Sequence, residues 1–254
     1  MKTKALGAKV ILKGRTLNES QTFVEQTVKK ENLTLIHPYD DENVILGQGT
    51  IGLELIEKVP DLEAILIPVG GGGLISGIAV AVKSINPKVK IYGIQTEKFP
   101  SMYNVFKSKK LKILGDTLAD GIAVKTPGKL TQAIISNFVD EILLVNEFDI
   151  ERAISNLFEN ERIVSEGAGA VGVAAILKKP SLFRKKNIGS IVCGGNIDAR
   201  VFASILNRKL SMDGRMTKVR IDIVDEPGTL ARISNLIGNN GGNIIEIYHQ
   251  RMFH

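Results

Sequence analysis

The chain has 254 residues, of which 44% are hydrophobic and 24% charged, and its formal net charge is +6 with a pI near 9.3. These values are typical of a globular protein with one large domain or two unequal ones. Aromatic residues make up only 5%, and the densest basic cluster is the short run Arg184-Lys185-Lys186, so the composition argues against a nucleic-acid surface.

The single cysteine excludes an internal disulfide and fits a reducing compartment. No apolar run is long enough to span a membrane, and the start Met1-Lys2-Thr3-Lys4 leads into no signal-peptide core. We therefore expect a soluble cytoplasmic protein with neither a membrane nor a nucleic-acid partner.

The first 60 residues predict alternating strands and helices. Two apolar runs, residues 8–12 and 34–37, are strand-like and flank an amphipathic helix over residues 20–30. A turn at Pro38-Tyr39-Asp40-Asp41 opens a second helix over residues 44–59. This helix contains Gly47, Gly49 and Gly52, and each glycine costs about 1 kcal/mol against alanine. Such glycines indicate close packing against a neighbour or a ligand.

The middle of the chain continues this alternation. A buried strand over residues 64–68 is followed by four glycines, a helix over residues 74–85 and a strand over residues 89–95. Later segments predict helices at 130–138, after Asn146, at 166–179 and after Asp198, with strands at 142–145 and 188–193. This order predicts an α/β fold, a mainly parallel sheet with helices on both faces.

The pattern of predicted elements changes after Lys209. Residues 211–215 resemble a linker, and they are followed by a predicted strand over 217–224, a helix over 229–237 and a strand over 243–248. One βαβ unit of this size is too small to fold alone. It must pack on the larger domain or form part of a larger module.

The glycine run from Gly70 to Gly73 predicts an anion cradle. Consecutive glycines let backbone N–H groups face one point, and the N-terminus of the following helix adds a favourable dipole. A merely flexible loop is the alternative, which the abrupt change from buried strand to buried helix disfavours. A P-loop is excluded, because no lysine followed by serine or threonine ends the run.

A dinucleotide site is the main rival interpretation. The spacing Gly71-x-Gly73-x-x-Ser76 has serine where the fingerprint requires glycine or alanine. Glu97 nevertheless closes the next strand where a ribose-binding acid belongs, about 20 residues on. We rank this interpretation below a simple phosphate site.

Three further residues lie at strand ends or helix starts. Cys193 ends a strand directly before Gly194-Gly195, where its thiol faces either a ligand or the core. Glu166 precedes a small-residue helix and either complements its dipole or lines a site. Asp120 is a turn residue. The histidines form no metal-ligand cluster, and a G-x-S-x-G nucleophile elbow is absent.

Six ordered motifs carry a family resemblance over residues 5–205. They are His37-Pro38-Tyr39-Asp40-Asp41, Gly47-Gln48-Gly49-Thr50-Ile51-Gly52-Leu53-Glu54, Pro68-Val69-Gly70-Gly71-Gly72-Gly73-Leu74-Ile75-Ser76-Gly77, Ala119-Asp120-Gly121, Glu166-Gly167-Ala168-Gly169 and Cys193-Gly194-Gly195-Asn196-Ile197-Asp198. Together they resemble threonine dehydratase (threonine ammonia-lyase), of the tryptophan-synthase-β-like pyridoxal-phosphate enzymes that include serine dehydratase and serine racemase. Residues 216–254 resemble the start of an ACT regulatory domain.

The resemblance implies a pyridoxal 5′-phosphate cofactor and an amino-acid substrate. L-threonine would be converted to 2-oxobutanoate and ammonia, in isoleucine biosynthesis or threonine catabolism. In this family the glycine run binds the cofactor phosphate, and a serine or cysteine lies beside the pyridine nitrogen. The matching positions here are Gly70, Gly71, Gly72, Gly73 and Leu74 for the phosphate, Cys193 for the ring nitrogen, and Gly121, Glu166 and Gly194 for the lining.

Two family motifs are not found in the 254 residues. One is the Ser-x-Lys-x-Arg-Gly-like motif with the Schiff-base lysine, and the other is the Ser-x-Gly-Asn-His loop that binds the substrate carboxylate. We therefore expect an N-terminally truncated and inactive chain with no catalytic residue of its own. The resemblance divides it into a remnant of the small domain (1–36), a large cofactor-binding domain (37–208), a linker (209–215) and a partial ACT-like βαβ domain (216–254).

Other expectations follow from the same resemblance. Gln95 and Ser101 stand where the racemase branch has two metal-binding acids, so no divalent metal is expected there. The full-length protein is expected to be a homo-oligomer, with isoleucine or valine as the allosteric ligand of the ACT domain. Serine dehydratase, a non-catalytic cofactor- or amino-acid-binding remnant and, last, a nicotinamide-dinucleotide protein are the alternatives.

Overall fold

The computed structural model describes residues 2–14 and 17–250, and the chain forms two compact units, Met1–Lys209 and Leu210–His254. The sheet and all nine residues predicted to bind the cofactor belong to the first unit. None of the described helices is long and apolar enough to cross a membrane.

A four-stranded parallel sheet with the order β3-β2-β1-β4 is the centre of the first unit. Its strands are β1 (Ala64–Pro68), β2 (Lys90–Thr96), β3 (Glu141–Val145) and β4 (Ile188–Ser190). Ala64 pairs with Lys90 on one side and with Ile188 on the other. All five residues of β1 are buried, as a continuous apolar run predicts for a central parallel strand. The predicted α/β fold is confirmed.

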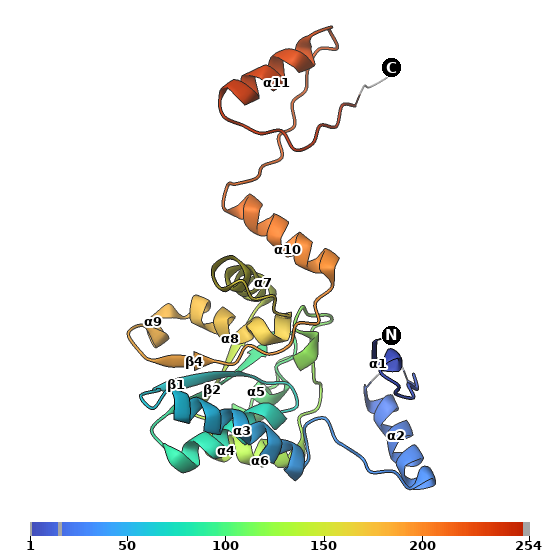
Figure 1. The fold of residues 1–254 in the computed structure, drawn as a ribbon, viewed down its shortest axis with the longest axis vertical. Helices are drawn as coiled ribbons and strands as arrows, with labels where there is room; N and C mark the ends of the chain where they lie inside the picture. Colours follow the sequence, from blue (N-terminus) through green and yellow to red (C-terminus); the bar gives the residue numbers. More distant parts are fainter. Residues whose placement is uncertain (1, 15–16, 251–254) are drawn as a thin grey trace. The chain divides into compact units, whose positions relative to one another are not determined.

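Four helices cover one face of the sheet and lie below it in Figure 1, namely α3 (Glu42–Lys58), α4 (Gly73–Ile85), α5 (Ser101–Phe106) and α6 (Lys129–Phe138). The glycines of α3 explain its contact with α4, because a Cβ on Gly52 would lie only 3.0 Å from the carbonyl oxygen of Ile78. Gly49 approaches Gly77 in the same way, whereas Gly47 faces open space. The predicted backbone packing therefore holds for two of the three glycines.

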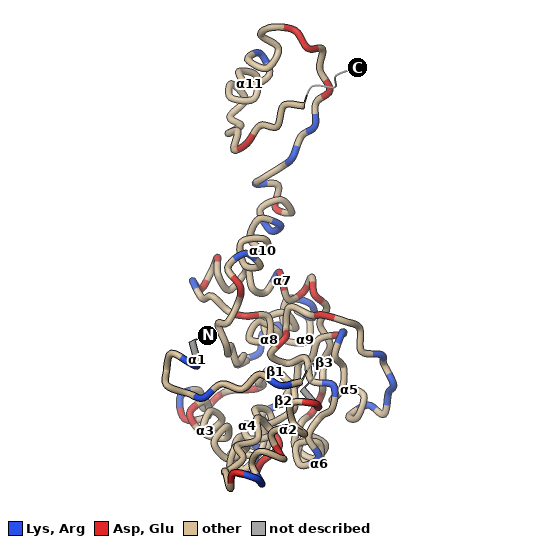
Figure 2. Tube along the Cα trace, turned by 90° about the vertical axis from the view of Figure 1, so that its right-hand side faces the viewer, with Lys and Arg blue, Asp and Glu red and all other residues tan. Residues whose placement is uncertain are grey.

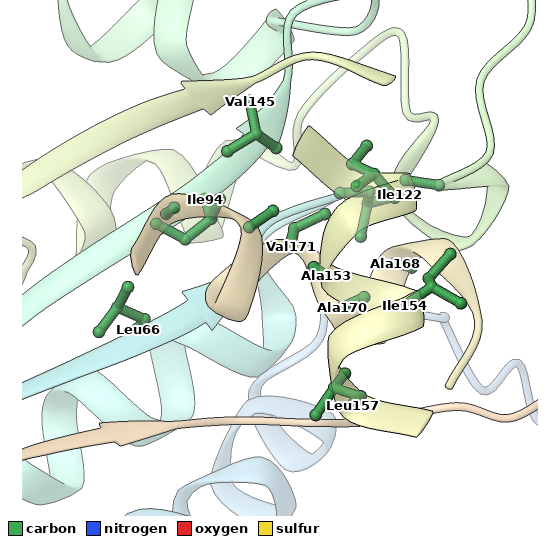
Figure 3. Close-up of a cluster of buried hydrophobic side chains, with 14 of the residues drawn as sticks. Leu66, Ile94, Ile122, Val145, Ala153, Ile154, Leu157, Ala168, Ala170 and Val171 are labelled. Carbon is green, nitrogen blue, oxygen red and sulfur yellow. The ribbon is translucent and has the colours of Figure 1, made fainter. Parts of the chain in front are cut away.

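The opposite face is covered by α7 (Glu147–Asn156), a π-helix (Leu157–Glu161), α8 (Gly167–Lys178) and α9 (Pro180–Phe183). Asn146 and Asp149 form a capping box at the start of α7, which confirms the predicted cap. The small residues of α8 let it lie close to the strands, and Figure 3 shows Ala168, Ala170 and Val171 in one cluster with Leu66 and Ile94.

Basic and acidic residues are interspersed along the first unit (Figure 2). Before β3, the Asp140 carboxylate accepts hydrogen bonds from Lys83 at 2.8 Å and Lys90 at 2.7 Å. After β2, Lys178 of α8 binds Glu97 at 2.7 Å and Asp149 at 3.0 Å. These clusters tie helices α4, α7 and α8 to opposite ends of the neighbouring strands β2 and β3.

The N-terminal segment is helical in α1 (Lys2–Ala5) and α2 (Leu17–Glu31), which confirms the predicted helix over residues 20–30. The strands predicted at 8–12 and 34–37 are wrong, because these residues pair with no strand in the part of the chain that the structure describes. Leu12 is 76% exposed and Ile36 75% exposed. An apolar run becomes a strand only when another strand completes its hydrogen bonds and a core covers its face.

The C-terminal part contains α10 (Ala199–Met212) and α11 (Thr229–Asn239). Helix α10 is docked on α7 through two 2.8 Å hydrogen bonds from Arg208 to Glu151, and it continues to Met212, into the segment expected to be a linker. Helix α11 confirms the predicted helix. The strands predicted at 217–224 and 243–248 are wrong, because these segments form no ladder with any residue described between 17 and 250, and Val219 and Ile245 are exposed.

Candidate cofactor site

The site lies at the point where the connection order of the sheet reverses. From β1 the chain moves to β2 and β3 on one side, and it then returns to place β4 on the other side of β1. The loops that follow β1 and β4 therefore leave the same edge of the sheet as neighbours. Ligands of open α/β sheets bind at such a switch point. The β1 loop contains Gly70–Gly73, and the β4 loop contains Cys193 and Gly194.

The glycine loop is a set of unused hydrogen-bond donors. Within the described residues, no acceptor is found for the backbone N–H groups of Gly70, Gly71, Gly72, Gly73 and Leu74. Gly72 has φ of +100°, which only glycine adopts easily, and α4 begins at the next residue. Five donors at the N-terminus of a 13-residue helix suit a phosphate group.

Two side chains close in on this loop from outside it. A Cβ on Gly71 would lie 2.2 Å from Cγ of Tyr39, so the tyrosine ring packs directly on the backbone. The hydroxyl of Thr131, which is fully buried, donates to the carbonyl oxygen of Gly71 at 2.7 Å. Partial burial, with a smaller contribution from Asp40, raises the pKa of Tyr39. Its protonated hydroxyl donates to the Thr126 carbonyl at 3.2 Å.

Glu166 occupies the other end of the site, between two glycines. A Cβ on Gly121 would lie 3.0 Å from its Oε1, and a Cβ on Gly194 only 2.3 Å from the same atom. The N–H of Asn196 donates to Oε2 at 3.0 Å, and the N–H of Glu166 donates to the Gly194 carbonyl at 3.2 Å. The carboxylate is therefore held against the β4 loop.

Cys193 lies beside this carboxylate, three residues after the end of β4. Its side chain is half-buried, and Gly169 of α8 is close enough that a Cβ there would fall 1.9 Å from the Cys193 carbonyl oxygen. Burial, and to a smaller extent the charge of Glu166, raises the pKa of the Cys193 thiol. The thiol is therefore uncharged at neutral pH.

The two ends of the site are joined by the segment around Gly121. A Cβ on Gly70 would lie 3.1 Å from Cα of Ile122, and Gly121 in turn faces Glu166. A continuous path of contacts therefore leads from the glycine loop to Cys193. The nine residues predicted from the sequence belong to the glycine loop and the first residues of α4, to this connecting segment, or to the end of the site around Glu166 and the β4 loop.

The sequence model described as "Pyridoxal-phosphate dependent enzyme" matches residues 1–194, well over half of the chain. The chain belongs to this family. Its cofactor carries a phosphate group, and the five unused N–H donors fit that group. The resemblance inferred from the six motifs is thereby confirmed at the level of the family.

Similar proteins occur in bacteria and plants. The L-threonine ammonia-lyase of Thermotoga maritima is 44% identical over 252 residues, which cover 98% of this chain and 63% of the relative. The L-threonine ammonia-lyase of Geobacter sulfurreducens is 41% identical, with 98% and 62% covered. The chain thus spans less than two thirds of these relatives.

The fold is also similar to those of solved structures. The processed form of threonine deaminase isoform 2 from Solanum lycopersicum has a TM-score of 0.73 and 37% identity, with 80% of this chain and 57% of that chain covered. Maize serine racemase has a TM-score of 0.72 and 31% identity, with 82% and 66% covered. The tryptophan-synthase-β-like fold expected from the resemblance is confirmed.

Three further residues discussed from the sequence, Glu97, Gln95 and Ser101, are ion-paired or hydrogen-bonded within the protein. Glu97, the candidate ribose acid, is paired with Lys178, so the dinucleotide interpretation loses its main support. The Gln95 amide donates to the Val69 carbonyl at 3.1 Å and accepts from the Tyr103 N–H at 2.8 Å. Ser101 donates to the Val124 carbonyl at 2.6 Å.

Two residues that touch the glycine loop were not predicted from the sequence. Tyr39 belongs to the His37–Asp41 motif, but that motif indicated only a turn and a family. Thr131 is one polar residue inside an amphipathic helix, and no local pattern distinguishes it. Both act through contacts with residues far along the chain.

Proposed function

We propose that this chain is the cofactor-binding part of an L-threonine ammonia-lyase that converts L-threonine to 2-oxobutanoate and ammonia. The observation that carries the proposal is the set of five unused N–H donors at one end of the site, joined by a continuous path of contacts to Glu166 and Cys193 at the other. The 44% identity to an L-threonine ammonia-lyase supports the substrate.

In this proposal each part of the site has its own task. The N–H groups of Gly70 to Leu74 bind the cofactor phosphate, and Gly121, Glu166 and Gly194 line the cofactor. The uncharged Cys193 thiol would lie beside the pyridine nitrogen and would not fully protonate it. The cofactor, when bound, would supply the electron withdrawal at the α-carbon of the amino acid, and these residues would orient it.

We further propose that turnover requires a lysine motif and a carboxylate-binding loop that the 254 residues do not supply. The chain alone should then bind pyridoxal phosphate without turning over L-threonine. Absorbance titration measures the binding, and a borohydride step followed by peptide mapping detects covalent attachment. An adduct at a single lysine, or 2-oxobutanoate formed by the chain alone, would overturn this part of the proposal.

A pair of glycine variants makes the binding test specific. Gly71→Ala should abolish saturable binding, because its Cβ would fall 2.2 Å from the Tyr39 ring. Gly47→Ala, with nothing within 4 Å of its Cβ, should bind like the wild type. Absence of saturable binding by the wild-type chain would contradict the proposed site.

L-serine is the second candidate substrate, because maize serine racemase shares the fold at 31% identity. Relative rates of 2-oxobutanoate and pyruvate formation by the lysine-containing enzyme decide between the two. We also propose that the protein is a cytoplasmic homo-oligomer, and that residues 216–254 belong to an ACT-like domain that binds a regulatory amino acid such as isoleucine.

A further inference from the structure

The His37–Asp41 turn connects two helices to the glycine loop. The backbone N–H groups of Tyr39 and Asp40 donate to Nδ1 of His37, at 3.2 and 2.8 Å, and fold this segment into a compact turn. The His37 ring also meets the Tyr39 ring edge-on, with centroids 4.7 Å apart. The turn thereby presents Tyr39, Asp40 and Asp41 to separate partners.

Asp40 caps helix α6 from about 90 residues away along the chain. Its carboxylate accepts hydrogen bonds from the N–H groups of Lys129 at 2.9 Å, Leu130 at 3.0 Å and Thr131 at 3.2 Å. Gly128, at the cap position of α6, has no side chain for this task, and a Cβ there would collide with Asp40 Oδ1 at 2.2 Å. The carboxylate therefore replaces a local cap and neutralises the positive end of the α6 dipole.

Helix α6 in turn holds the peptide between Gly71 and Gly72. The Thr131 hydroxyl donates to the Gly71 carbonyl at 2.7 Å, and a Cβ on Gly72 would lie 2.8 Å from the Thr131 Cβ. In a planar trans peptide the C=O and the N–H point in opposite directions. Fixing the Gly71 carbonyl on Thr131 therefore aims the N–H of Gly72 away from α6.

The Asp40 carboxylate also prevents a competing anion site. The N-terminus of α6 is adjacent to the glycine loop, because the Gly128 N–H approaches the Gly71 carbonyl at 3.4 Å. Without Asp40, three N–H groups of α6 would be open to an anion within reach of that loop. With Asp40 in place, the open donors belong to the glycine loop and α4.

We propose that Asp40 and Thr131 are positioning residues for the phosphate cradle. Asp40 closes the N-terminus of α6 and seats Thr131, whose hydroxyl orients the Gly71–Gly72 peptide. The inference rests on the proposed cofactor site and assigns it two residues that bind no cofactor atom themselves.

Calorimetric titration of the 254-residue chain with pyridoxal phosphate, and separately with inorganic phosphate, tests this inference. Asp40→Ala and Thr131→Val should each weaken binding about tenfold, the effect of losing a buried hydrogen bond with its alignment. Thr131→Ser keeps the hydroxyl and should stay within about twofold of the wild type.

Asp41→Ala is the matched control. Asp41 is also a helix cap, accepting from the N–H groups of Asn43 at 2.9 Å and Val44 at 3.1 Å, but it caps α3. Its loss should lower the unfolding temperature as Asp40→Ala does and leave the dissociation constants unchanged. Each variant is titrated well below its own unfolding temperature. If Asp40→Ala does not fold, Thr131→Val still tests the inference.

Equal weakening by Asp40→Ala and Asp41→Ala would reduce Asp40 to a general stabilising role and overturn the inference. Wild-type affinity in Thr131→Val would overturn it as well. A wild-type chain that binds inorganic phosphate but not pyridoxal phosphate counts against the proposed function alone, because the variants still report on the cradle through phosphate.

Discussion

The backbone N–H of Glu166 donates to the carbonyl oxygen of Gly194 at 3.2 Å, while the Glu166 carboxylate lies where a side chain at Gly194 would be. The Asn196 N–H binds the second carboxylate oxygen at 3.0 Å. Both the backbone N–H and the side-chain carboxylate of Glu166 therefore bind the β4 loop. This arrangement determines where Cys193 lies relative to the rest of the site.

Gly194→Ala should therefore damage the site and the fold together. The new Cβ would fall 2.3 Å from Glu166 Oε1, and φ of +77° costs a non-glycine residue about 1–2 kcal/mol. We expect weaker pyridoxal-phosphate binding and a lower unfolding free energy by denaturant titration. Gly195→Ala is the control, since its Cβ would meet only the Val164 carbonyl at 3.5 Å. Equal effects of both variants would contradict the account.

The reactivity of Cys193 should depend on Glu166. Because burial and, secondarily, the Glu166 charge raise the pKa of Cys193, its alkylation by iodoacetamide should have a midpoint at a higher pH than that of free cysteine. Glu166→Gln should shift this midpoint to lower pH without reaching the free-cysteine value, since burial remains. Glu97→Gln, whose partner is Lys178, should not move it. An unchanged midpoint in Glu166→Gln would be inconsistent with the geometry.

Glycine-to-alanine substitutions in α3 and α4 should have opposite effects on stability, depending on whether the glycine lies at the contact between the two helices. A Cβ on Gly77 would lie 2.2 Å from the Ile45 carbonyl oxygen, so Gly77→Ala should lower the unfolding free energy by about 1–3 kcal/mol. Gly47 belongs to the same helix pair but faces open space, so Gly47→Ala should raise the unfolding free energy by about 1 kcal/mol. Thermal unfolding of the two variants should move in opposite directions.

Asp140 should make stability depend on acid pH. Partial burial raises its pKa, but hydrogen bonds from Lys83, Lys90 and the Ile91 N–H outweigh burial and leave the pKa below its ordinary value. A carboxyl whose pKa is lower in the folded state stabilises the fold above its unfolded pKa, near 3.9, and loses this contribution as the pH falls through the folded pKa.

Asp140→Asn should accordingly be less stable than the wild type at pH 7, by about 2 kcal/mol. The difference should shrink as the pH falls below about 4. Denaturant titrations across the acid range measure this difference in unfolding free energy. Asp61→Asn, at an exposed position, is the control. A difference that stays constant down to pH 2 would show that the ion pairs do not shift the Asp140 pKa.

The sheet could be predicted from the sequence wherever a strand is buried on both faces. β1 has five buried residues, and its apolar run, its glycines and the helix after it all agree. The segments predicted as strands at 8–12 and 34–37 also contain apolar residues, but they find no pairing strand among the described residues. Apolar content shows that a segment can pair, and it does not show that a partner is present.

For the candidate site, the sequence could indicate only the residues that local patterns mark. Glycine runs and strand-end residues such as Cys193 are local signals, and a parallel sheet brings strand ends together. The contributions of Asp40 and Thr131 depend on contacts with residues 60 to 91 positions away along the chain. No local pattern contains that information, so only the folded structure shows it.

Backbone amide resonances of Gly70 to Leu74, followed by NMR during titration, test the central claim most directly. Pyridoxal phosphate and inorganic phosphate should both shift these five resonances, because both present a phosphate to the unused N–H groups. Pyridoxal, which lacks the phosphate, should leave them nearly unmoved. Equal shifts with pyridoxal, or phosphate-induced shifts confined to other segments such as the start of α6, would contradict the assignment of this loop as the phosphate cradle.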